Sequence, residues 1–203
     1  MLEIVRLGAL DEQLREQMQL EIKHIHENLG VMVVYVTHDQ GEALTVSNRI
    51  AVFNDGVIQQ LAAPAELYEQ PQNAFVAHFV GENNRLQGKV VAINGTTCEV
   101  ELPGAANVQA LAINVEAVGL PAVQSLRPER VKLTTPGSLL DVFDARVTEL
   151  IYFGDHARTR VSVCGHDDFV VTLPNSETVA KVEPGAEITI GWRTEDCRVL
   201  NAP

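Results

Sequence analysis

The chain has 203 residues and a mass of 22.2 kDa, with 46% hydrophobic and 21% charged residues, proportions typical of a soluble globular protein with one large or two small domains. No apolar run approaches the roughly 18 residues that span a bilayer, and the three cysteines are far apart and form no C-x-x-C pair. This pattern argues against a disulfide framework and a zinc site and predicts a reducing, cytoplasmic compartment. The net charge of −12 disfavours nucleic acid as a partner, because phosphate recognition needs a basic surface.

An amphipathic helix is the first predicted element. Asp11 is a good N-cap residue for it, and Gly30 suits the left-handed position that closes a helix. Its apolar residues fall at helical spacing on one face and are Leu14, Met18, Ile22, Ile25 and Leu29.

The next stretch, Val31–Val36, is apolar without alternation and predicts a strand buried on both faces, as in a parallel sheet covered by helices. The polar residues Thr37, His38 and Asp39 follow it directly. Ligands of such sheets bind beyond the carboxyl ends of the strands, and a histidine there can offer one donor to a phosphate. A strand that merely ends in a polar turn is the alternative.

Helices and strands continue to alternate as far as residue 82. Asn-Asp-Gly at 54–56 predicts a tight turn between two strands, and a proline or an asparagine opens each of the two helices that come next. The expected elements are a short helix over 40–47, strands over 49–53 and 57–61, a helix from Pro64 to Pro71, and a helix between Asn73 and Gly81.

From residue 86 onward the pattern becomes short β-like runs separated by turn residues, which predicts one or two small barrels. A hairpin is expected over 88–102, with Asn94-Gly95 as a type I′ turn. Arg127-Pro128-Glu129 is interpreted as a surface turn whose salt bridge contributes little. Further strands are expected over 122–126, 131–133, 145–152, 157–163, 169–173 and 187–192.

Several of these segments resemble the ATPase subunits of ABC importers. The β-rich tail, with its Arg-Pro-Glu element, resembles the OB-like regulatory region called TOBE, and the run over 81–88 is most similar to the polyamine branch. The resemblance implies an α+β chain: a partial α/β (RecA-like) ATPase segment at residues 1–81, followed by an all-β OB-like (TOBE) barrel region at residues 82–203. The ATPase-like segments are LGALD (7–11), YVTHDQGEA (35–43), NDG (54–56), residues 64–71 and FVAHFVGE (75–82).

Two site assignments follow from this resemblance. Leu10 and Asp11 match the D-loop, which in the family contacts the nucleotide site of the partner across a dimer. His38 matches the switch histidine that hydrogen-bonds the γ-phosphate of ATP. An imidazole fits that task, because phosphoryl transfer needs donors aimed at the γ-phosphate oxygens and the attacking water.

Other parts of the family's nucleotide site are missing from the sequence. There is no G-x-x-x-x-G-K-[ST] loop, no L-S-G-G-Q signature and no Q-loop. Ile4 and Val5 stand where the family has the magnesium-site Asp and the catalytic Glu, and neither side chain can do that chemistry. We therefore expect the carboxyl-terminal portion of an importer ATPase that neither binds ATP and Mg²⁺ tightly nor hydrolyses ATP alone, with no metal site of its own.

The expected partners also follow from the resemblance: the permease subunits of an importer at the inner face of the plasma membrane, and a second copy of the chain. Without flanking strands, Val31–Val36 would be an exposed apolar edge, which predicts a homodimer that either covers this edge or exchanges segments between its chains. The alternative function is a non-enzymatic regulatory module whose OB-like barrels bind a small solute. The acidic balance of the chain would suit a cationic effector such as a polyamine.

Overall fold

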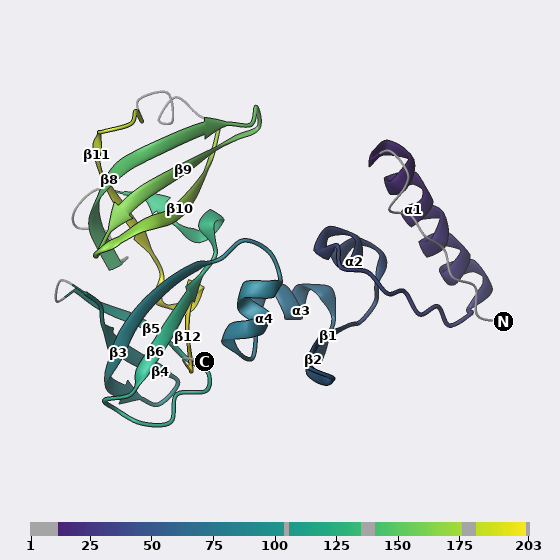
Figure 1. Ribbon diagram of the computed structural model, residues 1–203, viewed down its shortest axis with the longest axis horizontal. Coiled ribbons are helices and arrows are strands. Elements are labelled where there is room, and N and C mark those ends of the chain that lie inside the picture. The colour runs from purple at the N-terminus through teal and green to yellow at the C-terminus, as the bar shows by residue number, and fades with distance from the viewer. Residues whose placement is uncertain (1–11, 104–105, 135–140, 176–181, 202–203) are drawn as a thin grey trace. The chain divides into compact units, whose positions relative to one another are not determined.

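The computed structural model describes residues 12–103, 106–134, 141–175 and 182–201 and divides into two compact units, Met1–Pro71 and Gln72–Pro203, shown as ribbons in Figure 1. The sequence-based boundary at residues 81 and 82 lies after helix α4 (Ala74–Phe79), whereas the structural division places this helix with the β-rich unit.

The described part of the first unit contains three α-helices and one hairpin. Helix α1 ends as predicted, with Gly30 in the left-handed region at φ +63°. Strands β1 and β2 pair antiparallel around a turn in which Asp55 and Gly56 both have positive φ, as a type I′ turn requires. The elements are α1 (Glu12–Leu29), α2 (Gln40–Val46), β1 (Ile50–Asn54), β2 (Val57–Ala62) and α3 (Pro64–Glu69).

The prediction that Val31–Val36 forms a buried strand is wrong. These residues belong to no strand, and Met32, Val34 and Val36 are 91%, 74% and 90% exposed. A run of β-branched residues favours an extended backbone. Neighbouring elements are still needed to bond that backbone into a sheet and to cover its apolar side chains. Within the described part of this unit the sheet is the β1–β2 hairpin alone, so the RecA-like segment expected at residues 1–81 is not seen.

The second unit is mostly β and contains a closed five-stranded barrel with strand order β12-β5-β4-β3-β6. β12 closes it by pairing parallel to β5 and antiparallel to β6. The predicted hairpin over 88–102 is confirmed as β3 and β4, with Gly95 at φ +65°. The barrel strands are β3 (Asn84–Asn94), β4 (Thr97–Glu101), β5 (Asn107–Ala112), β6 (Pro121–Leu126) and β12 (Cys197–Asn201).

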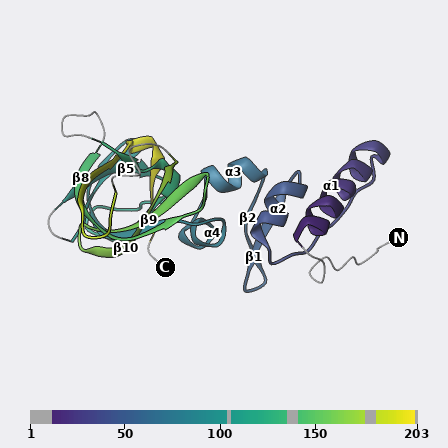
Figure 2. The ribbon, with the colours of Figure 1, turned by 90° about the horizontal axis from the view of Figure 1, so that it is seen from above.

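A second, antiparallel sheet of five strands follows in the order β10-β9-β8-β11-β7, and Figure 2 shows how the strands of this unit curve. Short 3-10 helices η1 (Pro128–Arg130) and η3 (Thr194–Asp196) precede β7 and β12. All strands predicted in this region are present. They are β7 (Lys132–Leu133), β8 (Asp141–Tyr152), β9 (His156–Val163), β10 (His166–Pro174) and β11 (Glu187–Trp192).

One continuous apolar core joins the barrel and this sheet. Trp192 is fully buried and its ring stacks with Phe143 and Phe169, at centroid distances of 4.8 and 5.8 Å. Gly88 allows a close approach of β3 to β4, because a Cβ at this position would lie 2.6 Å from the carbonyl oxygen of Glu101. Among the described residues, no helix has the length and apolar character needed to cross a membrane.

Candidate functional site

The polar turn before α2 is built around the cap of that helix. Asp39 has an extended backbone, and its Oδ1 accepts a hydrogen bond from the Glu42 backbone N–H at 3.1 Å. The carboxylate thus satisfies one of the N–H groups that a helix leaves without an internal partner. The cap makes α2 begin at Gln40 and leaves His38 in the turn.

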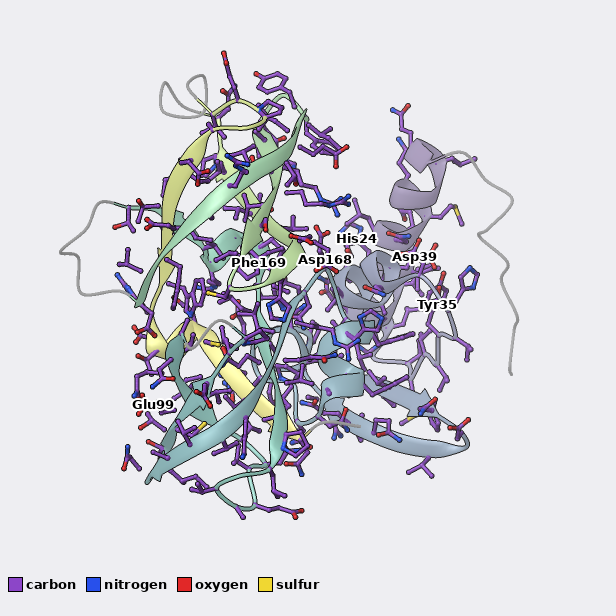
Figure 3. All side chains as sticks on the ribbon, turned by 60° about the vertical axis from the view of Figure 1, so that its left-hand side comes forward. His24, Tyr35, Asp39, Glu99, Asp168 and Phe169 are labelled. Carbon is purple, nitrogen blue, oxygen red and sulfur yellow. The ribbon has the colours of Figure 1, made fainter. Side chains whose placement is uncertain are left out.

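Two side chains that precede His38 in the chain meet at the carboxylate of Glu42, which follows it. Oε2 of Glu42 accepts hydrogen bonds from the Tyr35 hydroxyl at 2.8 Å and from the Thr37 hydroxyl at 2.6 Å. The Thr37 hydroxyl oxygen accepts in turn from the Asp39 backbone N–H at 2.9 Å. Glu42 is only 7% exposed. Tyr35 and Asp39 are labelled in Figure 3.

His38 itself is exposed at the outer side of this turn. Its imidazole can donate one N–H to an anionic oxygen, which is the chemistry the sequence predicted for it. Leu10 and Asp11, and the substituted positions Ile4 and Val5, lie outside the described residues, so the D-loop assignment remains a prediction. The described residues contain no cluster of three or more His, Cys, Asp or Glu side chains that could hold a metal ion.

A second set of polar contacts joins the elements of the β-rich unit at the entry to β3. Three consecutive side chains each contact a different strand: Glu82 forms an ion pair with Arg158 of β9, Asn83 accepts from the Ser125 hydroxyl of β6, and Asn84 bonds the Val170 backbone of β10. We call residues 82–84 the junction. It holds the barrel and the second sheet to one short segment.

Arg127 contradicts its interpretation as part of a surface turn. It is 6% exposed, and its guanidinium donates to the carbonyl oxygens of Ala77 in α4, at 3.4 Å, and of Glu82, at 3.0 Å. The last carbonyls of a helix have no internal partner, so a cation that bonds one of them stabilises the helix end. The sequence placed Arg127 between two strands but carried no signal that it reaches a helix some 50 residues away.

The cysteines offer no reactive thiolate. Burial raises the pKa of the Cys98 and Cys164 thiols, and it raises that of fully buried Cys197 further, with nearby Asp141 adding to the shift. These thiols therefore stay protonated at neutral pH. Cys197 instead donates to the Oε1 of buried Gln124 at 3.5 Å.

Comparison with known proteins identifies the β-rich region: residues 124–200 match the family model for the TOBE domain. Three relatives are named as spermidine/putrescine import ATP-binding proteins. The one from Rubrobacter xylanophilus is 39% identical to this chain, the one from Pseudomonas aeruginosa 38% and the one from Chromobacterium violaceum 41%. The alignments cover 96%, 97% and 92% of this chain and 52%, 55% and 53% of the relatives. The chain thus spans about half the length of the curated relatives it matches.

Among solved structures, the chain is similar to the cytoplasmic molybdate-binding protein ModG, determined with molybdate bound. The TM-score is 0.51 and the identity 18%, over 59% of this chain and 96% of that one, so the likeness concerns the fold alone. It agrees with the OB-like barrels predicted for the tail. The chain therefore carries a TOBE domain, and along almost its whole length it resembles part of the ATP-binding subunit of a polyamine-type ABC importer.

Proposed function

We propose that this chain is the part of an ABC importer's ATP-binding subunit that senses the γ-phosphate and carries the regulatory domain, in a system that imports polyamines. The observation that carries the proposal is the 37–41% identity to spermidine/putrescine import ATP-binding proteins along 92–97% of the chain. The exposed His38 and its hydrogen-bonded turn support the sensing role. ATP-driven uptake itself belongs to an assembly with the permease subunits at the inner face of the membrane.

A chimera tests this proposal. Residues 7–203 would be joined to the part of the Rubrobacter xylanophilus relative that the chain does not match, so that the relative supplies everything before Leu7. In cells that lack their own subunit, we expect the chimera to support spermidine uptake and its His38→Ala variant to lose it. His24→Ala, which alters another exposed histidine, is the matched control and should retain uptake. A chimera with no uptake, or one indifferent to His38→Ala, would contradict the proposal.

The chain alone is proposed to be inactive towards ATP. The sequence holds no loop that could cradle the phosphates, and Val5 cannot orient a water molecule as a carboxylate does. We expect no phosphate release from Mg²⁺-ATP by the purified chain. A turnover that disappears in His38→Ala would overturn this part of the proposal, as would tight ATP binding measured by calorimetry.

A second copy of the chain is proposed as a partner because the apolar side chains of the segment 31–36 are exposed, Met32 and Val36 most of all. An extended apolar segment that is open to solvent associates readily with another edge. We expect a dimer by light scattering that is weakened by Val34→Lys. Val57→Lys, which places the same charge at another exposed valine, should leave the dimer intact. A monomer at all concentrations would argue against this proposal.

Binding of a small solute by the TOBE region is the alternative function, without catalysis. The core formed by residues between 86 and 199 lies wholly within the β-rich unit, so this unit has the hydrophobic core that a regulatory module without an ATPase part needs. A thermal-shift series with spermidine, putrescine and molybdate tests it, and a saturable rise in Tm would favour a liganded regulator. No shift with any of the three would count against this alternative.

A further inference from the structure

We propose that Glu42 is a positioning residue for His38: its buried carboxylate holds the turn that presents the imidazole. The role assigned to the imidazole rests on the proposed function, whereas the positioning itself concerns this chain alone. The Glu42 carboxylate bonds Tyr35 and Thr37, which precede His38, and the Glu42 backbone N–H bonds Asp39, which follows it. Glu42 therefore acts on His38 through these neighbours.

The bonds around the turn form a closed circuit. The Glu42 side chain accepts from Tyr35 and Thr37, the Thr37 hydroxyl accepts from the Asp39 N–H, and the Asp39 side chain accepts from the Glu42 N–H. Each member therefore restrains the next, and the circuit returns to the residue from which it began. His38 is the residue within the turn whose side chain the circuit leaves exposed.

Alternation along the extended chain explains why the circuit leaves His38 outside. Successive side chains of an extended backbone point to opposite sides. Tyr35 and Thr37 are partly buried and share the side that faces Glu42, whereas Val36, at 90% exposure, and His38 share the other. The carboxylate thus selects which alternate residues turn inward, and His38 is presented to solvent as a consequence.

Burial gives the circuit its strength. A carboxylate that is 7% exposed exchanges few hydrogen bonds with water, so losing its two hydroxyl donors would leave a buried charge poorly satisfied. Hydrogen bonds to an ionised group are also stronger than those between neutral groups. A turn held in this way needs less backbone reordering when an anionic oxygen reaches His38, and the first shell of a binding site works best when supporting residues fix it.

Histidine NMR on the full chain tests the proposal. The chain has six histidines, so His38→Gln would assign the His38 backbone amide signal in a sample labelled at histidine. In Glu42→Ala we expect the order parameter of this backbone amide to fall below about 0.6, the range of flexible backbone. Glu42→Gln should preserve the wild-type value, because the amide oxygen can still accept both hydroxyl bonds.

The matched control is Glu66→Ala. Glu66 is also a glutamate in the first turn of a short helix, α3, but it is exposed. It should leave the His38 signals unchanged. A purely structural role of Glu42 would instead lower stability equally in the Ala and Gln variants or leave the His38 backbone ordered in both, and either result would overturn the proposal.

A second variant keeps the test decisive if Glu42→Ala unfolds α2. Thr37→Val is nearly isosteric and removes both the donor to Glu42 and the acceptor for the Asp39 N–H. It should lower the His38 order parameter while α1 and the β1–β2 hairpin keep their amide signals. An ordered His38 backbone in this variant contradicts the inference even if the chimera transports spermidine, and a failed chimera leaves the NMR result unaffected.

Discussion

The carboxamide of Asn84 bonds Val170 as a neighbouring strand would. Its Nδ2 donates to the Val170 carbonyl oxygen and its Oδ1 accepts from the Val170 N–H, both at 2.7 Å, and the side chain is 4% exposed. β10 is the outer strand of its sheet, so Val170 would otherwise leave a donor and an acceptor unsatisfied inside the unit. One side chain from the start of β3 thus links the barrel to the edge of the second sheet.

Removing this amide should destabilise the unit strongly. We expect Asn84→Ala to lower the free energy of unfolding by about 2–4 kcal/mol, because two buried backbone groups lose their partners. Asn107→Ala removes a single exposed bond to Glu99 and should cost less than about 0.5 kcal/mol. Urea unfolding of both variants gives the comparison. Equal urea midpoints for the two variants would show that the Asn84 hydrogen bonds contribute no more to stability than the exposed Asn107 bond.

Replacing Arg127 should loosen helix α4 specifically. Met keeps most of the apolar stem but cannot bond the Ala77 and Glu82 carbonyls, and the expected loss is about 1–3 kcal/mol. Hydrogen exchange at residues 74–79 should therefore become faster in Arg127→Met. Arg146→Met removes an exposed ion pair with Glu187 and should leave that exchange unchanged. Unaltered protection of α4 in Arg127→Met would refute the link.

A methyl group at position 88 should strain the barrel. The Cβ of an alanine there would meet the Val100 side chain at 2.5 Å and the Glu101 carbonyl oxygen at 2.6 Å, and the backbone atom cannot move without disturbing β4. We expect Gly88→Ala to cost about 1–3 kcal/mol, as overpacked cores do. Thermal unfolding checks this, with Lys89→Ala at the next, exposed position as the control. An unchanged Tm in Gly88→Ala would mean that the strands separate at little cost.

Asp141 should make stability decrease as the pH rises. Burial raises the pKa of this carboxyl above its usual 3.8; the Gln109 backbone N–H opposes the rise and the charge of Glu99 adds to it. A folded state with the higher pKa binds the proton more tightly, so stability contributed by Asp141 is present in acid and is lost as the pH rises through the folded pKa. Asp141→Asn should therefore be more stable than wild type at neutral pH, with the difference vanishing below about pH 3.8.

Asp155 should change the pH dependence of stability in the direction opposite to Asp141. Its hydrogen bond with His156 is the main cause that lowers the pKa of Asp155, so its contribution is present above the usual pKa and is lost in acid. Unfolding curves of Asp141→Asn and Asp155→Asn from pH 3 to 7 should thus diverge from wild type in opposite directions. Parallel curves would contradict both assignments.

Local chemistry explains the features that the sequence predicted well. Asn94-Gly95 and Asp55-Gly56 specify their turns because few residues adopt positive φ, and the hairpins form around them. The end of α1 at Leu29 and the Asp39 cap of α2 follow from equally local rules. By contrast, β5 and β12 were not predicted, because Val108 is the one β-branched residue of β5 and β12 pairs with strands distant in sequence.

The sequence by itself determined where the chain bends, which segments extend and which histidine stands beyond the apolar run. Only the tertiary structure decided which of these segments are covered: Val31–Val36 stays exposed although its composition is that of a core strand, whereas charged Arg127 is buried. The reason is physical. Backbone preference is a property of neighbouring residues, but burial depends on partners far along the chain, and a sequence pattern does not say whether those partners are present.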